Sequence, residues 1–281
     1  MKIGITGSSG FIGSHLRERL KKEGYDLLLF SRSAGQSILS KEDLEEAVKE
    51  CDLVIHLASV VGRKAADDNA PETIETNVVG TARVASVCGM LGKPLLFFSS
   101  VAVYGYNSGS AMDESYPPDP QEFYSASKLS GEWILRGLGM AGHLRYTIVR
   151  PSVVYGPGMS QASFLFRLIR DIARGDSVRI PENDIRSYIF IDDLIDAVAA
   201  VLRKGAKNET VNLSSRESVP LEEFAGLVRE VTGSSARIEV GAKVTRSQII
   251  DPSRAEQAFG WTARVPLREG IGKTVRWIQS L

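Results

Sequence analysis

KIGITGSSGFIG, residues 2–13, is an apolar run followed by a glycine-rich turn and the start of a helical pattern. In a strand–turn–helix unit the first glycine, Gly7, allows the tight turn, and Gly10 lets the backbone approach a pyrophosphate. The last, Gly13, lets the helix pack closely on the strand. The start of the helix offers free N–H groups and a positive dipole end to phosphates. Because the three glycines lie at the start of a βα unit, they predict a dinucleotide site.

The composition is that of an ordinary globular protein without a charge bias. The chain has 281 residues, of which 43% are hydrophobic and 24% are charged. This length allows one large domain, or a domain with an added lobe. The 34 basic and 34 acidic residues balance, so charge gives no argument for a nucleic acid or a membrane as partner. A small anionic molecule remains open as a ligand.

Cys51 and Cys88 have no metal-binding spacing and are too few for a disulfide framework. We therefore expect reduced thiols in a cytoplasmic protein, and no metal site. The first strand begins at Lys2, so we expect no signal peptide. No apolar run reaches the length of a membrane span, so we also expect no transmembrane segment.

Strand and helix patterns alternate through the first half of the chain. Apolar runs predict buried strands, and amphipathic runs predict the helices between them. Strands are expected at 2–6, 27–30, 52–58, 94–100 and 146–150, and helices begin near residues 11, 41, 71 and 123. This alternation predicts an α/β fold with a Rossmann-like, doubly wound parallel sheet.

The pattern changes after Pro151. Further helices are expected at about 164–172, 194–201, 221–231 and 271–278, with a short strand at 186–193. We divide the chain into a dinucleotide-binding domain, residues 1–151, and a smaller C-terminal lobe, residues 152–281, that mainly binds substrate. A segment at about 185–204 is expected to return to the first domain.

The end of the second strand bears on the choice of cofactor. NAD-binding domains usually place Asp or Glu there, on the ribose hydroxyls. This chain has Ser31-Arg32-Ser33 instead. A serine and an arginine suit a 2′-phosphate, because a guanidinium makes charge-assisted contacts with phosphate. The alternative is a solvated arginine in a loop. The sequence favours NADP, and NAD remains open.

Tyr124 and Lys128 are four residues apart in a predicted helix, so they share one face. Tyrosine, with an ordinary pKa of about 10, is a poor base at neutral pH. A neighbouring ammonium is expected to lower that pKa, which makes Tyr124 usable as an acid or a base. Ser100 ends a strand at the edge where open α/β sheets bind ligands, so its hydroxyl can contact a substrate oxygen. His56, at another strand end, is expected to be a packed residue without a chemical role.

Three motifs together resemble the extended short-chain dehydrogenase/reductase family, most closely its nucleotide-sugar epimerase/dehydratase group. They are Thr6–Gly13, Phe97–Ser100 followed by Val103-Tyr104-Gly105, and Tyr124–Lys128. Weaker matches extend over nearly the whole chain: His56–Ala58, Asn77 with Gly80-Thr81, Arg150-Pro151, Tyr155–Pro157, Arg186–Leu194, and Phe259–Trp261 with Pro266. The resemblance implies a homodimer, paired through the helices that begin near Pro71 and Tyr124.

The resemblance also implies the residues of the site. The implied catalytic set is Ser100, Tyr124 and Lys128. The implied contacts to the cofactor are Gly7, Ser9, Gly10, Phe11, Ile12, Gly13, Ser31, Arg32, Leu57, Ala58, Ser59, Asn77, Tyr124, Lys128 and Pro151. The implied contacts to the substrate are Ser100, Tyr124 and Arg186. An isolated asparagine in a helix such as Asn77 is otherwise usually a surface or packing residue, and Arg186 is equally well a salt-bridged residue of the lobe.

The chain departs from the family pattern in three places. Val101 and Ala102 stand where sugar dehydratases carry an Asp-Glu pair, so acid-catalysed dehydration lacks its residues. Ser31-Arg32 replaces the acidic end of the second strand. Val60-Val61 shows no lysine for the cofactor pyrophosphate. These departures count against the tightly held NAD that an epimerase recycles.

The sequence therefore predicts an NAD(P)-dependent epimerase or reductase that transfers hydride between nicotinamide and a carbon of a nucleotide-linked sugar. One alternative is an NADPH-dependent reductase of a keto-sugar or another small carbonyl compound. The other is a non-catalytic NADP-binding sensor on the same fold.

Overall fold

The computed structural model describes residues 1–31, 35–107 and 109–281. By its internal contacts the chain forms two compact units. Unit 1 comprises residues 1–105, 117–150 and 198–211, and unit 2 comprises residues 106–116, 151–197 and 212–281. The division by role, with its limit at residue 151 and a returning segment at about 185–204, stays a prediction.

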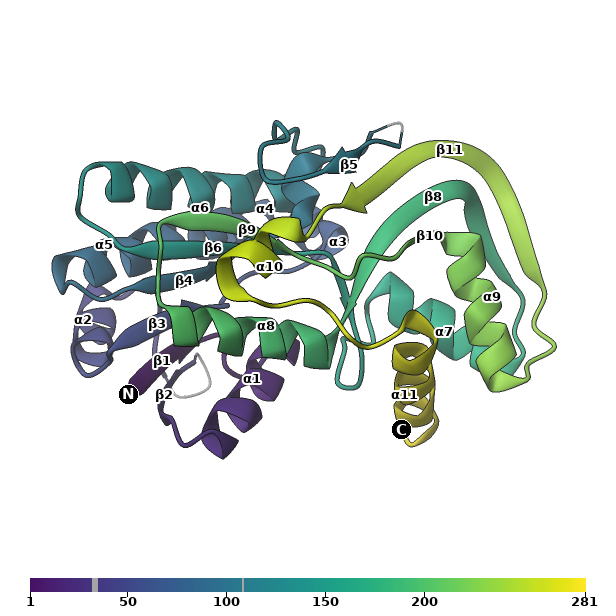
Figure 1. Ribbon diagram of the computed structural model, residues 1–281, viewed down its shortest axis with the longest axis horizontal. Helices are drawn as coiled ribbons and strands as arrows, with labels where there is room; N and C mark the ends of the chain where they lie inside the picture. Colours follow the sequence, from purple (N-terminus) through teal and green to yellow (C-terminus); the bar gives the residue numbers. More distant parts are fainter. Residues whose placement is uncertain (32–34, 108) are drawn as a thin grey trace. The chain divides into compact units, whose positions relative to one another are not determined.

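Unit 1 is built on a six-stranded sheet in the order β2-β1-β3-β4-β6-β9 (Figure 1). Its strands are β1 (Lys2–Thr6), β2 (Asp26–Phe30), β3 (Leu53–His56), β4 (Leu95–Phe98), β6 (Tyr146–Pro151) and β9 (Glu209–Leu213). The four pairs from β2 to β6 are parallel. Because β2 and β3 lie on opposite sides of β1, the order reverses at β1, and open sheets bind ligands at such a switch point. The predicted Rossmann-like α/β fold is confirmed.

The helices of unit 1 connect these strands. They are α1 (Phe11–Lys22), α2 (Lys41–Lys49), α3 (Arg63–Asp68), α4 (Ala70–Thr73), α5 (Thr81–Met90) and α6 (Phe123–Met140), with a π-helical segment η2 (Ile74–Gly80) and a 3₁₀ turn η3 (Val101–Tyr104). Side chains of α2, α5 and α6 share one buried core with β2, β3, β4 and β6. The long helix expected from Pro71 is therefore α4, η2 and α5 in succession, with a wider turn at Ile74–Gly80.

Unit 2 contains a second sheet, in the order β10-β8-β11-β5, with β7 paired to β8. Its strands are β5 (Ala111–Met112), β7 (Val153–Tyr155), β8 (Val178–Phe190), β10 (Ser218–Pro220) and β11 (Ile238–Ile250). Its helices are α7 (Phe164–Arg174), α9 (Leu221–Thr232), α10 (Ser253–Phe259) and α11 (Leu267–Gln279). Helix α8 (Ile191–Lys204) begins in unit 2 and ends in unit 1.

The sequence-based limits are wrong for the two long strands of unit 2. The strand expected at 186–193 begins at Val178 and ends at Phe190, and the sequence pattern predicts no strand where β11 lies. Pro181 and Asn183, which has a φ of 62°, interrupt β8 with a turn-like sequence. The register of β8 and β11 shifts twice. Bulges of this kind break the alternation of side chains by which a strand is recognised.

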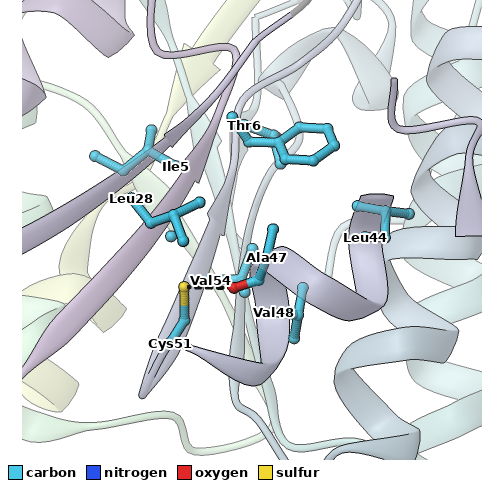
Figure 2. A pocket seen from close by; sticks show the side chains of 10 residues that line it. Ile5, Thr6, Leu28, Leu44, Ala47, Val48, Cys51 and Val54 are labelled. Atoms are coloured by element: carbon cyan, nitrogen blue, oxygen red, sulfur yellow. Dashed lines mark hydrogen bonds between the residues drawn. The ribbon is translucent and has the colours of Figure 1, made fainter. Parts of the chain in front are cut away.

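The described residues contain no helix that is long and apolar enough to cross a membrane. Both cysteines are free and buried. Cys51 lines a small apolar cavity of about 10 Å³ between β1, β2, β3 and α2 (Figure 2), and its thiol donates to the carbonyl of Ala47 at 3.2 Å. A cavity of this size is barely large enough for one water and offers that water few polar partners. It is therefore a packing gap and not a ligand site.

Candidate active site

The glycine-rich turn after β1 has the geometry that its sequence predicts. Gly7 has a φ of 71°, and a Cβ added there would lie 2.6 Å from the amide nitrogen of Ala58. A Cβ added at Gly13 would lie 2.3 Å from the carbonyl oxygen of Gly7. Only glycine fits either position, because real Cβ atoms do not approach backbone so closely. These two glycines bring β1, the end of β3 and the first turn of α1 together.

The start of α1 suits a phosphate. Gly10 is the N-cap and has no side chain with which to cap the helix. Ser9 and Gly10 are exposed, and Phe11 and Ile12 are half-buried. The first N–H groups of a helix have no partner within it, and here they lie beside exposed backbone. These residues therefore fit the pyrophosphate of a dinucleotide.

His56 is a structural residue, as expected from the sequence. Hydrogen bonds join its ring to Thr6 at 2.6 Å and to Thr81 at 3.0 Å. Burial, together with the nearby charge of Lys128, lowers the pKa of His56 to about 3. The ring is therefore neutral at physiological pH. It links the end of β1, the end of β3 and the first residue of α5.

Asn77 fixes the chain after β3. Its side-chain oxygen accepts from the N–H of Val60 at 2.8 Å, and its amide group donates to the carbonyl of Val60 at 3.0 Å and to Ser127 at 2.9 Å. Both amide protons are thereby used. The predicted direct contact of Asn77 with a cofactor stays a prediction, and the contacts seen hold the segment of Leu57, Ala58 and Ser59 beside α6.

Ser100, Tyr124 and Lys128 all belong to unit 1. Ser100 is the N-cap of η3, and its hydroxyl oxygen accepts from the N–H of Ala102 at 3.1 Å. The hydroxyl of Ser100 lies near the phenol of Tyr124, close enough to affect its pKa. The structure therefore brings the hydroxyl at the end of β4 to the phenol at the start of α6, as proton transfer through these groups requires.

Lys128 lies one turn further along α6. Its side chain is 4% exposed, its ammonium donates to the carbonyl of Phe98 at 2.9 Å, and it lies 5.3 Å from the ring centroid of Phe97. It lies 5.9 Å from the ring centroid of Tyr124. Burial lowers the pKa of Lys128 to about 7. Lys128 can therefore lose its charge at a pH where an exposed lysine keeps it.

The expected lowering of the pKa of Tyr124 by Lys128 is wrong for this structure. Burial raises the pKa of Tyr124 to about 12, and the nearby hydroxyl of Ser100 opposes that rise without cancelling it. Desolvation disfavours the charged form of each group, so it acts on the phenol and on the ammonium in opposite directions. Tyr124 is therefore protonated and set to donate, while Lys128 is set to lose its proton.

The structure describes Ser31 but not Arg32. The N–H of Ser31 donates to the side-chain oxygen of Gln36 at 3.4 Å. Arg32, the residue on which the choice of NADP over NAD depends, lies outside the described residues. Pro151, the last residue of β6, belongs to unit 2.

Arg186 lies in β8 of unit 2 and makes a two-pronged ion pair. Its Nε and Nη2 donate to the carboxylate of Asp184 at 2.7 and 2.9 Å. Its guanidinium lies 5.7 Å from the ring centroid of Tyr106, and the guanidinium of Arg246 lies 5.6 Å from the same ring. Asp184 is 2% exposed. The salt-bridged role weighed for Arg186 is thus present, and the contact with a diphosphate stays a prediction.

We predict that Arg186 also binds the diphosphate of the substrate. Arg186→Ala alone would leave Asp184 buried without a partner, so Arg186→Ala combined with Asp184→Asn is the cleaner variant. Calorimetry should show that a nucleoside diphosphate binds about tenfold more weakly or worse, because a charge-assisted hydrogen bond is lost. Asp184→Asn alone is the control. Unchanged affinity for the nucleoside diphosphate in the double variant would leave Arg186 with its structural role only.

Comparisons with known proteins agree with this geometry. The sequence profile of the NAD dependent epimerase/dehydratase family matches residues 3–214. This chain belongs to that family. Its match includes the glycine turn, the end of β4 and the Tyr124–Lys128 segment of α6. Family membership confirms the resemblance found in the sequence, and the chain is an enzyme of the extended short-chain dehydrogenase/reductase type.

Three similar proteins span essentially the whole chain. UDP-N-acetyl-alpha-D-glucosaminuronate decarboxylase of Bacillus cytotoxicus is 26% identical over 99% of this chain and 97% of its own length. UDP-glucose 4-epimerase of Mycolicibacterium smegmatis is 27% identical over 100% of this chain and 99% of its own length. The structure of MoeE5 in complex with UDP-glucuronic acid and NAD is 27% identical, covers 100% of both chains and has a TM-score of 0.90.

Sequence reasoning gave no role to three residues beside the proposed catalytic set: Glu132 was not singled out, and Ser99 and Arg150 were quoted only as parts of motifs. The side chains of Glu132 and Arg150 are 0% and 1% exposed and form an ion pair. The available signal was spacing, because Glu132 follows Lys128 by one helical turn and Tyr124 by two. A glutamate on the buried face of a helix needs a partner.

Proposed function

We propose that this enzyme is an NAD(P)-dependent epimerase that acts on a UDP-linked sugar by transferring hydride between nicotinamide and a sugar carbon. The observation that carries the proposal is the grouping of three side chains in unit 1: Ser100 lies near the phenol of Tyr124, and Lys128, one turn further along α6, lies 5.9 Å from the Tyr124 ring centroid. UDP is proposed as the nucleotide because the similar proteins named above act on or bind UDP-sugars.

The chain's own residues supply binding and proton transfer. The glycine turn and the start of α1 hold the cofactor's pyrophosphate, and a bound nicotinamide supplies the hydride acceptor. Tyr124 exchanges a proton with the sugar hydroxyl. Ser100 donates to the same oxygen and stabilises it as its charge changes. Lys128 is proposed to bind the ribose of the cofactor, and its hydrogen bond to the carbonyl of Phe98 holds the end of β4 that precedes Ser100. Epimerisation requires that the hydride return to the other face of the same carbon.

The proposal is tested by turnover of a panel of UDP-sugars that includes UDP-glucose and UDP-glucuronic acid. Proton NMR should show the epimer accumulating to equilibrium, without net change in absorbance at 340 nm, because the cofactor is regenerated in each cycle. Epimerisation in D₂O should place no deuterium on the inverted carbon, since the hydride is held on the cofactor. Turnover without an epimer, or release of CO₂, would reject the epimerase.

A reductase is the second candidate, favoured by Ser31-Arg32-Ser33 at the end of β2. These residues lack the carboxylate that binds the ribose of NAD. A reductase would consume one NADPH for each keto-sugar reduced, so absorbance at 340 nm would fall in step with product. A non-catalytic sensor would bind the cofactor and show neither reaction.

We predict that NADP⁺ binds more tightly than NAD⁺ and that Arg32→Ala narrows the difference. A guanidinium beside the 2′-phosphate would make charge-assisted hydrogen bonds with it, and such bonds contribute roughly 1.5–3 kcal/mol. Calorimetry with both cofactors measures the ratio of affinities. Arg19→Ala, at a partly exposed arginine of α1 that pairs with Glu23, is the control. An unmutated protein that binds NAD⁺ as tightly as NADP⁺ would contradict the prediction.

We also propose that the enzyme is a cytoplasmic homodimer. Two free, buried cysteines are typical of a reducing compartment. Large apolar side chains are exposed on η2 and α6 of unit 1, the helices for which the family resemblance implies pairing. They are Ile74 (47% exposed), Val79 (37%), Trp133 (59%) and Met140 (90%). Sedimentation velocity would measure the mass in solution.

A further inference from the structure

Glu132 of α6 and Arg150 of β6 form an ion pair that is almost completely buried. The side chains are 0% and 1% exposed. Nε of Arg150 donates to one carboxylate oxygen of Glu132 at 2.8 Å, and Nη2 donates to the other. Arg136, also on α6, approaches the same carboxylate at 3.5 Å. Such a fork fixes two side chains in both distance and orientation.

The carboxylate of Glu132 also holds the end of β4. The hydroxyl of Ser99 donates to it at 2.5 Å. The residue before Ser99 is Phe98, whose carbonyl accepts from Lys128, and the residue after it is Ser100. Two neighbouring residues of the β4 end are therefore tied to α6 by consecutive turns of the helix. These ties set where Ser100 lies relative to the helix that carries Tyr124.

Arg150 also contacts η3, the turn that follows the end of β4. Its guanidinium lies 4.7 Å from the ring centroid of Tyr104, which is 1% exposed. Tyr104 is the last residue of η3, and Ser100 caps the first turn of η3. The ring of Tyr104 therefore anchors the far end of the turn that holds the hydroxyl of Ser100.

We propose that Glu132 and Arg150 are positioning residues that fix Ser100 against Tyr124 and Lys128 for proton transfer, a role that rests on the proposed function of that set. The pair lies behind these three residues and acts through Ser99, Tyr104 and α6. Neither member contacts the reacting atoms.

Stability alone does not account for the pair. Burying two charges costs free energy that their attraction only about repays, and replacing both by apolar residues of similar volume is often neutral or stabilising. What apolar residues cannot supply is the direction of the hydrogen bonds to Ser99 and of the contact with Tyr104. A misplacement of about 1 Å in an active site can reduce turnover ~10²-fold.

The test is the double variant Glu132→Met/Arg150→Met. It removes both fully buried charges together, and Arg136, which is 31% exposed, keeps its hydrogen bond to Thr210 at 3.1 Å. The double variant should therefore fold and unfold cooperatively near the temperature of the unmutated protein. Its kcat should fall about 10²-fold, while the KM for the UDP-sugar and the Kd for the cofactor change less than about threefold. Arg150→Lys, which keeps the charge but loses the fork, should retain an intermediate kcat. Lys41→Met/Glu45→Met, at an exposed ion pair of α2, is the control and should behave as the unmutated protein.

A second measurement separates this proposal from the proposed function. In the unmutated protein burial lowers the pKa of Lys128 to about 7. The proposed measurement is NMR of the lysine side chains, which needs no substrate. In the double variant the β4 end is released and water reaches the ammonium, so the pKa should rise towards 10.5.

If the unmutated protein converts none of the sugars, the proposed function fails and the pKa of Lys128 alone decides the positioning role. A double variant that keeps both the kcat and the pKa of the unmutated protein would overturn the proposal. The proposal would also be overturned if the control variant Lys41→Met/Glu45→Met lost as much kcat as the double variant.

Discussion

Tyr124→Phe is expected to lower kcat by ~10²–10⁴-fold, the usual contribution of a general acid or base. The substitution removes the hydroxyl and keeps the ring that packs against Lys128 at 5.9 Å. Calorimetry should therefore give the same affinity for the cofactor as in the unmutated protein. Steady-state turnover of the active UDP-sugar measures the effect on kcat.

Tyr116→Phe is the matched control for Tyr124→Phe. It removes a hydroxyl at 3.4 Å from the side chain of Asn107, and it should leave kcat within about twofold because Tyr116 has no part in the proposed proton transfer. A Tyr124→Phe protein with ordinary turnover would remove Tyr124 from the mechanism. A protein that also lost cofactor affinity would show that the hydroxyl serves binding.

Lys128→Met is expected to abolish most turnover and also to weaken cofactor binding. The ammonium is proposed to contact the ribose, and it donates to the carbonyl of Phe98 at the end of β4, so both contacts are lost together. Single-turnover kinetics and calorimetry measure the two effects separately. A protein that lost turnover but bound the cofactor normally would contradict the proposed ribose contact.

The same substitution should not destabilise the fold, which distinguishes a functional loss from unfolding. In the folded protein burial lowers the pKa of Lys128 to about 7, from 10.5. Below pH 7 both the folded and the unfolded states carry the proton, and the folded state bears the full cost of the buried charge. Between pH 7 and 10.5 the unfolded state binds more protons, so this cost shrinks as the pH rises. Lys128→Met should therefore raise the melting temperature most below pH 7 and not above 10.5.

The Rossmann-like unit could be predicted because its signals are local. The turn after β1 depends on positive φ at Gly7 and on the absence of a Cβ at Gly13, and both are properties of single residues. The spacing of Tyr124 and Lys128 follows from helix geometry. The packed position of His56 was predicted for the same reason, since a histidine within a buried strand is covered on both faces.

The structure of unit 2 is harder to predict from the sequence, because its long strands depend on partners that are distant along the chain. Strand β8 contains Pro181 and Asn183, which indicate a turn when read locally, yet β11 pairs with it through two shifts of register. The hydrogen bonds that stabilise β8 come from residues about sixty positions away along the chain, as the pairing of Ile238 with Val178 shows. Pattern within a short window cannot report such a contact, so β11 was missed.

The sequence by itself determined the fold of the first unit and the family, and it predicted the residues of the proposed proton-transfer set. Only the tertiary structure decided the direction in which the pKa of Tyr124 moves, the backbone contacts of Asn77 and the pairing of Glu132 with Arg150. The physical reason is the same for all three. Desolvation and partner choice depend on which atoms surround a side chain after packing, whereas steric limits and helical spacing are already fixed along the chain.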